Sequence, residues 1–135
     1  RQTFLGIWIR NLLSGEPIEV WGGDQLRDFN DVEDVVDALL IAAATTNLQT
    51  TPYNLGSDRK ITLLHLAELL IELNGNGDLR VIPFPPERQK IDIGDYYSCY
   101  AKFERETGWQ PRRTLESTLT RTLAFYHAHA EHYLR

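Results

Sequence analysis

The sequence predicts one domain of the α/β or α+β class, with about five helices and three or four short strands. Two observations lead to this prediction. Several stretches repeat apolar residues at helical spacing, begin at Asp or Thr and end at Gly, and short alternating runs lie between them. The chain has 135 residues, of which 42% are hydrophobic, which is enough for a modest packed core.

The first third of the chain should hold four elements. They are a helix that ends at Gly15, strands over residues 17–21 and 25–29, and a helix over 32–44 that Asp31 caps. The helix over 32–44 is apolar on most of its faces, so we expect it to lie at the centre of the core.

The remainder should hold a strand over 52–56, a helix from Thr62 to the glycines at 75 and 77, a strand over 79–84, a short helix over 101–108 and a final helix from Thr114. Residues 85–100 show no regular element and contain charges and tyrosines. Long loops of this kind often bind ligands.

Composition argues against several classes of protein. The net charge of -5 disfavours broad binding to nucleic acid or acidic lipid. The one cysteine, Cys99, cannot form an intrachain disulfide, which suits the cytoplasm. No apolar stretch approaches the roughly 18 residues of a membrane span. The chain begins with apolar residues at helical spacing and contains no methionine, so we expect a piece of a longer protein.

Arg27 is the first candidate binding residue. It follows the glycines at 22–23, which could leave room for a ligand. Its planar guanidinium group is suited to binding phosphate or carboxylate. The alternative is a surface ion pair with Asp24, Asp28 or Asp31. Both interpretations stay open from the residues alone.

The loop before residue 100 carries a second set of candidates. Arg88, Asp92, Asp95, Tyr96 and Tyr97 could together bind a polyhydroxylated, phosphorylated ligand, or could simply form packed surface. No metal site is predicted, because the acidic residues at 31–37 look like a solvated helix start and the histidines at 127–132 like a fraying terminal helix.

Two sequence motifs are missing from the chain. There is no glycine-rich G-x-G-x-x-G turn, which a dinucleotide site requires, and no Tyr-x-x-x-Lys pair. We therefore assign no catalytic and no cofactor-binding residue to this chain.

Four segments, taken in order, resemble the C-terminal part of the NAD-dependent epimerase/dehydratase family, the extended short-chain dehydrogenases. They are residues 12–42, 52–57, 61–70 and 92–111, which carry Arg-Asp-aromatic, Tyr-Asn-Leu-Gly and Gly-Trp-x-Pro. The resemblance implies that residues 1–135 form one small substrate-binding lobe of an extended Rossmann-type enzyme. The NAD-binding domain would be absent from this chain.

The resemblance also implies a nucleotide-diphosphate sugar as the ligand. Arg27 would reach the diphosphate, and Arg88 would bind phosphate from the loop. Trp21, with Val20 before it, would lie beside the nucleotide base.

Asp92 and Tyr96 match positions that contact the ribose or the sugar. The chain departs from the family pattern in two ways. Arg88 and Asp92 are one residue further apart than is common, and Cys99 replaces a frequent aspartate. The alignment of the loop over 85–100 therefore stays open.

The implied parent is a cytoplasmic, homodimeric, NAD-dependent epimerase or dehydratase, an isomerase or lyase of carbohydrate metabolism. The nucleotide base and the sugar of its substrate stay open, and so does the reaction. This chain alone should be inactive and should not bind NAD. The alternatives are a non-catalytic interaction or assembly module on the same scaffold, and a reductase of a non-nucleotide substrate.

Overall fold

The computed structural model describes residues 3–133, which form seven helices and four short strands. The helices are α1 (Phe4–Ser14), α2 (Val32–Ala44), α3 (Leu63–Asn74), α4 (Pro86–Gln89), α5 (Ala101–Thr107), α6 (Leu115–Ala128) and α7 (Ala130–Tyr133). The strands are β1 (Ile18–Trp21), β2 (Leu26–Asp28), β3 (Lys60–Thr62) and β4 (Leu79–Ile82). The predicted mixed class of helices and strands is confirmed.

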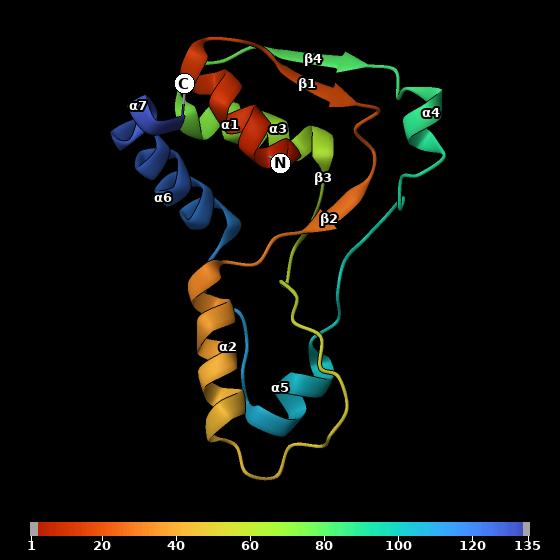
Figure 1. The fold of residues 1–135 in the computed structure, drawn as a ribbon, viewed down its shortest axis with the longest axis vertical. Coiled ribbons are helices and arrows are strands. Elements are labelled where there is room, and N and C mark those ends of the chain that lie inside the picture. Colours follow the sequence, from red (N-terminus) through yellow and green to blue (C-terminus); the bar gives the residue numbers. More distant parts are fainter. Residues whose placement is uncertain (1–2, 134–135) are drawn as a thin grey trace.

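The main core lies between a parallel strand pair and three helices. β1 pairs with β4 in the register Ile18↔Leu79 to Trp21↔Ile82, and α1, α3 and α6 contact one another beside this pair (Figure 1). The side chains of β1 alternate, so Ile18 and Val20 are fully buried while Glu19 and Trp21 face outward. One face of β1 therefore belongs to the core and the other is free to line a site.

β2 and β3 form an antiparallel pair that leads directly into α3. The hydroxyl of Thr62 accepts the backbone N–H of His65 at 3.2 Å and caps the helix, as the sequence predicts. Gly23 has φ +107°, and a Cβ there would lie 3.1 Å from the Cβ of Leu64. Close packing against α3, rather than room for a ligand, explains this glycine.

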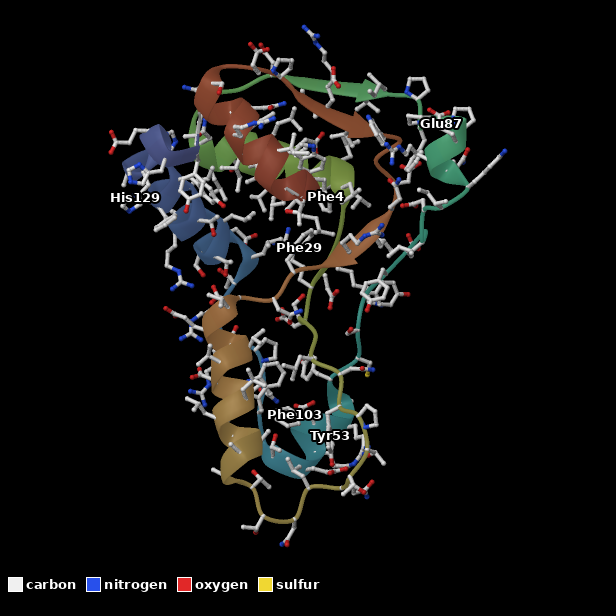
Figure 2. The ribbon with its side chains drawn as sticks, viewed as in Figure 1. Phe4, Phe29, Tyr53, Glu87, Phe103 and His129 are labelled. Atoms are coloured by element: carbon white, nitrogen blue, oxygen red, sulfur yellow. The ribbon has the colours of Figure 1, made fainter. Side chains whose placement is uncertain are left out.

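A second, smaller hydrophobic cluster lies at the other end of the molecule, between α2, α5 and Trp109. The rings of Tyr53 and Phe103 meet edge to face there, with centroids 5.6 Å apart (Figure 2). The indole N–H of Trp109 donates to the backbone carbonyl of Asp34 at 3.1 Å. This bond ties the segment after α5 to the first turn of α2.

Two aspartates at the start of α2 are buried rather than solvated, which corrects the sequence-based expectation. Asp31 is 4% exposed and Asp34 is 2% exposed. Asp34 pairs with Arg113 at 2.6 Å, and Asp31 pairs with Arg121. Arg113 lies 79 residues after Asp34, and Arg121 lies 90 residues after Asp31, so these pairings were not visible from local sequence.

Three other expectations about elements were wrong. Leu39, on the helix expected at the centre of the core, is 62% exposed, because this chain covers only one face of α2. Residues 52–56 are irregular, and the strand forms instead at β3. The loop over 85–100 includes the short helix α4.

Candidate functional site

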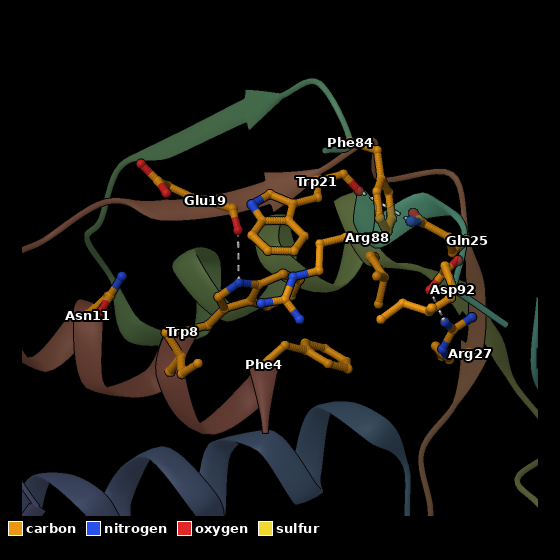
Figure 3. Close-up of a pocket in the computed structure, with 13 residues that line it drawn as sticks. Phe4, Trp8, Asn11, Glu19, Trp21, Gln25, Arg27, Phe84, Arg88 and Asp92 are labelled. Atoms are coloured by element: carbon orange, nitrogen blue, oxygen red, sulfur yellow. Dashed lines mark hydrogen bonds and ion pairs between the residues drawn. The ribbon is translucent and has the colours of Figure 1, made fainter. Parts of the chain in front are cut away.

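A cavity of about 440 Å³ opens between α1, the outer face of β1, β2 and the segment around α4 (Figure 3). Its lining residues are Phe4, Ile7, Trp8, Asn11, Glu19, Trp21, Gln25, Arg27, Leu63, Phe84, Arg88, Ile91 and Asp92. The cavity brings together four of the six residues predicted from sequence, namely Trp21, Arg27, Arg88 and Asp92.

One side of the cavity is aromatic. The ring centroids of Phe4 and Trp8 are 5.0 Å apart, and those of Trp21 and Phe84 are 5.9 Å apart. The indole N–H of Trp8 donates to the carbonyl of Glu19 at 3.0 Å, which fixes α1 against the outer side of β1. These rings offer flat apolar faces to a planar group.

Arg27 is held from one side by the backbone. Its Nη1 donates to the carbonyl of Leu26 at 2.8 Å and to the carbonyl of Gly94. Its Nη2 lies 3.7 Å from Oδ1 of Asp92, and its side chain is 14% exposed. Asp92 is therefore the carboxylate that faces Arg27, in place of the ion-pair partners Asp24, Asp28 and Asp31 considered from sequence.

Asp28, one of those alternatives, has a different role. Its Oδ2 accepts the backbone N–H groups of Ser57 at 3.4 Å and of Ser98 at 3.2 Å. It therefore joins β2 to two segments that are distant in sequence.

Arg88 enters the cavity from α4. The residue is exposed on the short helix, and its guanidinium reaches across toward Trp8 and Phe4 (Figure 3). Arg27 and Arg88 thus approach one cavity from separate segments. Two guanidinium groups in this arrangement can bind an anion with more than one negative oxygen.

The segment over residues 92–96 is joined to β2 by an isolated parallel bridge between Tyr96 and Arg27. The N–H of Tyr96 donates to the carbonyl of Leu26 at 3.0 Å, and the N–H of Leu26 donates to Asp95 at 2.8 Å. Oδ2 of Asp92 accepts the N–H of Gly94 at 3.0 Å. These bonds fix the position of Asp92 relative to Arg27.

Two predicted site residues do not line the cavity. The side chain of Val20 is fully buried in the main core, so only its backbone can reach a ligand beside β1. Tyr96 pairs with Arg27 through the backbone, and its side chain is exposed outside the cavity lining.

The wall that α1 contributes was missed from sequence. Phe4, Ile7, Trp8 and Asn11 line the cavity at helical spacing, and none of them was assigned to the binding site from sequence. Phe4 and Ile7 are in fact more than one third exposed. The apolar stripe of α1 is wider than one neighbouring layer of secondary structure can cover. This width was the signal in the sequence that could have revealed the wall.

The described residues lack the strand–turn–helix arrangement that typically holds a dinucleotide pyrophosphate. Over residues 3–133 no strand leads through a glycine-rich turn into a helix. No group of three or more His, Cys, Asp or Glu side chains suited to a metal occurs in this part of the chain either. No helix within the same residues is long and apolar enough to cross a bilayer.

Residues 1–56 match the family model described as the NAD dependent epimerase/dehydratase family. The chain is 32% identical over 130 residues to UDP-glucuronic acid decarboxylase 1 of Xenopus tropicalis, covering 93% of this chain and 29% of the relative. It is 33% identical over 136 residues to dTDP-glucose 4,6-dehydratase of Neisseria gonorrhoeae, covering 93% of this chain and 39% of that enzyme.

The chain belongs to the NAD-dependent epimerase/dehydratase family.

Solved structures support this membership. UDP-glucose 4-epimerase of Thermotoga maritima, determined with UDP-glucose, superposes with a TM-score of 0.79 at 28% identity, over 92% of this chain and 39% of the epimerase. An epimerase of Methanothermobacter thermautotrophicus shares the fold with a TM-score of 0.87 at 21% identity, over 98% of this chain and 39% of that one. The chain thus spans well under half the length of these relatives.

Proposed function

We propose that residues 1–135 are the nucleotide-sugar-binding lobe of an NAD-dependent sugar-nucleotide epimerase or dehydratase. The observation that carries this proposal is the convergence of Arg27 and Arg88, from separate segments, on a cavity with an aromatic wall. A nucleoside diphosphate needs both features, because its base is planar and its diphosphate carries two or more negative charges.

Four residues of the cavity lining have a role in this proposal. Arg27 and Arg88 bind the diphosphate from two sides. The base lies beside Trp21 and the backbone of Val20. Asp92, which lines the same cavity and faces Arg27, accepts a hydrogen bond from a ribose or sugar hydroxyl. Tyr96 contributes from the edge.

The lobe binds and orients the substrate, and the rest of the parent enzyme supplies the chemistry. NAD, held by a separate domain, would carry out the oxidation. Binding energy from the diphosphate, which does not react, is used to place the sugar for reaction. This chain alone is then inactive, and the parent is a cytoplasmic homodimer that acts as an isomerase or lyase.

Calorimetric titration of the chain with UDP-glucose and dTDP-glucose tests the proposal. Arg27→Ala should weaken binding by about 1.5–3 kcal/mol, which is the cost of one charge-assisted hydrogen bond. Arg88→Ala should act in the same direction. Arg105→Ala, an exposed arginine of α5 outside the cavity, is the matched control and should bind as the unaltered chain does. Equal affinity for the Arg27→Ala and Arg105→Ala chains would refute the diphosphate site.

A further inference from the structure

Asp28, which follows Arg27 on β2, binds two segments that are distant in sequence. Its Oδ2 accepts the backbone N–H groups of Ser57 at 3.4 Å and of Ser98 at 3.2 Å. A Cβ on Gly56 would lie 3.2 Å from the same oxygen and 3.0 Å from the carbonyl of Ser98, so the glycine allows the close approach. This single carboxylate oxygen therefore holds three parts of the chain together.

Residues 92–98, here called the strap, carry two groups that contact Arg27. Oδ1 of Asp92 lies 3.7 Å from Nη2 of Arg27, and the carbonyl of Gly94 accepts a hydrogen bond from Nη1. Within residues 92–98 there is no helix or named strand. The position of both groups therefore depends on the bonds that fasten the strap to its neighbours.

Two aspartates fasten the strap to β2 on either side of Arg27. Asp95, on the strap, accepts the N–H of Leu26 at 2.8 Å, and Asp28, on β2, accepts the N–H of Ser98. Leu26 and Asp28 directly flank Arg27 in the sequence. Hydrogen bonds to a carboxylate are stronger than those between neutral groups, so these two bonds hold the strap in register with Arg27.

The register of the strap decides how firmly the Arg27 side chain is held. The carbonyl of Leu26, which accepts Nη1 at 2.8 Å, belongs to the preceding residue and stays close in any case. The carbonyl of Gly94 stays close only while the strap is in place. An arginine that loses such a contact regains rotamer freedom, and a ligand must then supply the free energy to order it.

We propose that Asp28 and Asp95 are positioning residues for Arg27. They hold the strap against β2, and the strap presets the guanidinium for a diphosphate. This inference rests on the proposed function. The described residues that line the cavity include neither Asp28 nor Asp95, so both act through Arg27 and without contact to the ligand.

Calorimetric titration with inorganic pyrophosphate at low salt tests the inference. Asp28→Ala and Asp95→Ala should each weaken binding by about threefold to tenfold. Loss of a negative charge by itself favours an anion, so weaker binding cannot be an effect of charge. Asp58→Ala removes an exposed aspartate beside Ser57, outside the cavity lining, and is the matched control that should not weaken binding.

The Arg27→Ala background separates positioning from a purely structural role. Asp28→Ala should cost no further affinity when the Arg27 side chain is already absent, because it acts through that side chain. Asp28→Asn keeps an oxygen that can accept the N–H of Ser98 and should restore most of the affinity. An equal loss of affinity from Asp28→Ala in both backgrounds would overturn the inference.

Nitrogen-15 NMR of the Arg27 guanidinium gives a second readout that needs no ligand. Its signals are assigned by their loss in the Arg27→Lys chain. Rotation about the Cζ–Nε bond should be slow in the unaltered chain, and in the Asp28→Ala and Asp95→Ala chains it should become as fast as that of the exposed Arg105. Slow rotation that persists in these variants would overturn the inference.

The two readouts keep the inference separate from the proposed function. Asp95 is exposed, so Asp95→Ala provides the test if the Asp28→Ala chain does not fold. Pyrophosphate affinity that Arg27→Ala leaves unchanged would contradict the diphosphate site itself. Normal weakening by Arg27→Ala, with no effect of Asp28→Ala or Asp95→Ala, would overturn only the positioning role.

Discussion

The Nη2 atom of Arg27 lies 3.7 Å from Oδ1 of Asp92, and these two groups meet in the same cavity. The opposite side of the guanidinium is occupied by the carbonyls of Leu26 and Gly94. A phosphate that binds Arg27 must therefore approach the side that Asp92 also faces. Asp92 and the phosphate are both negative, so they compete for one cation.

Replacing Asp92 with Asn should strengthen the binding of inorganic pyrophosphate. The change keeps the shape of the side chain and removes its charge, and a unit charge at this distance near a surface contributes about 1 kcal/mol or less. We expect the affinity for pyrophosphate, measured by calorimetry at low salt, to rise by up to about fivefold. The gain should be smaller for UDP, because its ribose loses a hydrogen-bond acceptor. Asp24→Asn, at an exposed position outside the cavity lining, should change neither. Weaker binding of pyrophosphate to the Asp92→Asn chain would mean that Asp92 orients Arg27 instead of competing for it.

Leu66 and Leu39 should differ sharply in their contribution to stability. Leu66 is fully buried in the main core, and Leu66→Ala should lower the free energy of unfolding by about 2–5 kcal/mol. Leu39 lies on the exposed face of α2, so Leu39→Ala in this chain should change the free energy of unfolding by about 0.5 kcal/mol or less. Urea denaturation followed by tryptophan fluorescence measures both. A large loss for Leu39→Ala would show that α2 packs differently from the arrangement described.

Asp31 should contribute to stability in a pH-dependent way. Burial alone would raise the pKa of Asp31, but hydrogen bonds from Thr118, the backbone N–H of Glu33 and Arg121 together hold it below the ordinary value of 3.8. The carboxylate is therefore stabilising above pH 3.8, and this contribution is lost as the pH falls through the lowered pKa.

The Asp31→Asn chain should be less stable than the unaltered chain at pH 7, and the difference should shrink as the pH falls below 3.8. Free energies of unfolding measured from pH 7 to pH 3 provide the comparison, with the exposed Asp24→Asn chain as the control. A difference that stays constant over this range would exclude a lowered pKa as the cause.

Local signals in the sequence predicted much of the fold. The caps at Asp31, Thr62 and Thr114 and the glycine that ends α1 all formed as expected, because each depends on residues within one helical turn. The burial of Asp31 depends on Arg121, which is distant in sequence, so no local pattern could reveal it.

The face of α2 was mispredicted for another physical reason. Periodicity shows that a helix has apolar faces, but it does not show whether the partner of each face lies in the same chain. The candidate site was predicted through Trp21, Arg27, Arg88 and Asp92, whereas its α1 wall depends on how α1 lies beside β1.

The most direct test of the account is a pair of titrations of the unaltered chain, one with UDP and one with NAD, followed by calorimetry and tryptophan fluorescence. Trp8 and Trp21 line the cavity and should report its occupation. We expect saturable binding of UDP that high salt weakens, and no saturable binding of NAD. Stoichiometric binding of NAD at micromolar concentration, with no response to UDP, would contradict the assignment of the cavity to the nucleotide sugar and of NAD to another domain.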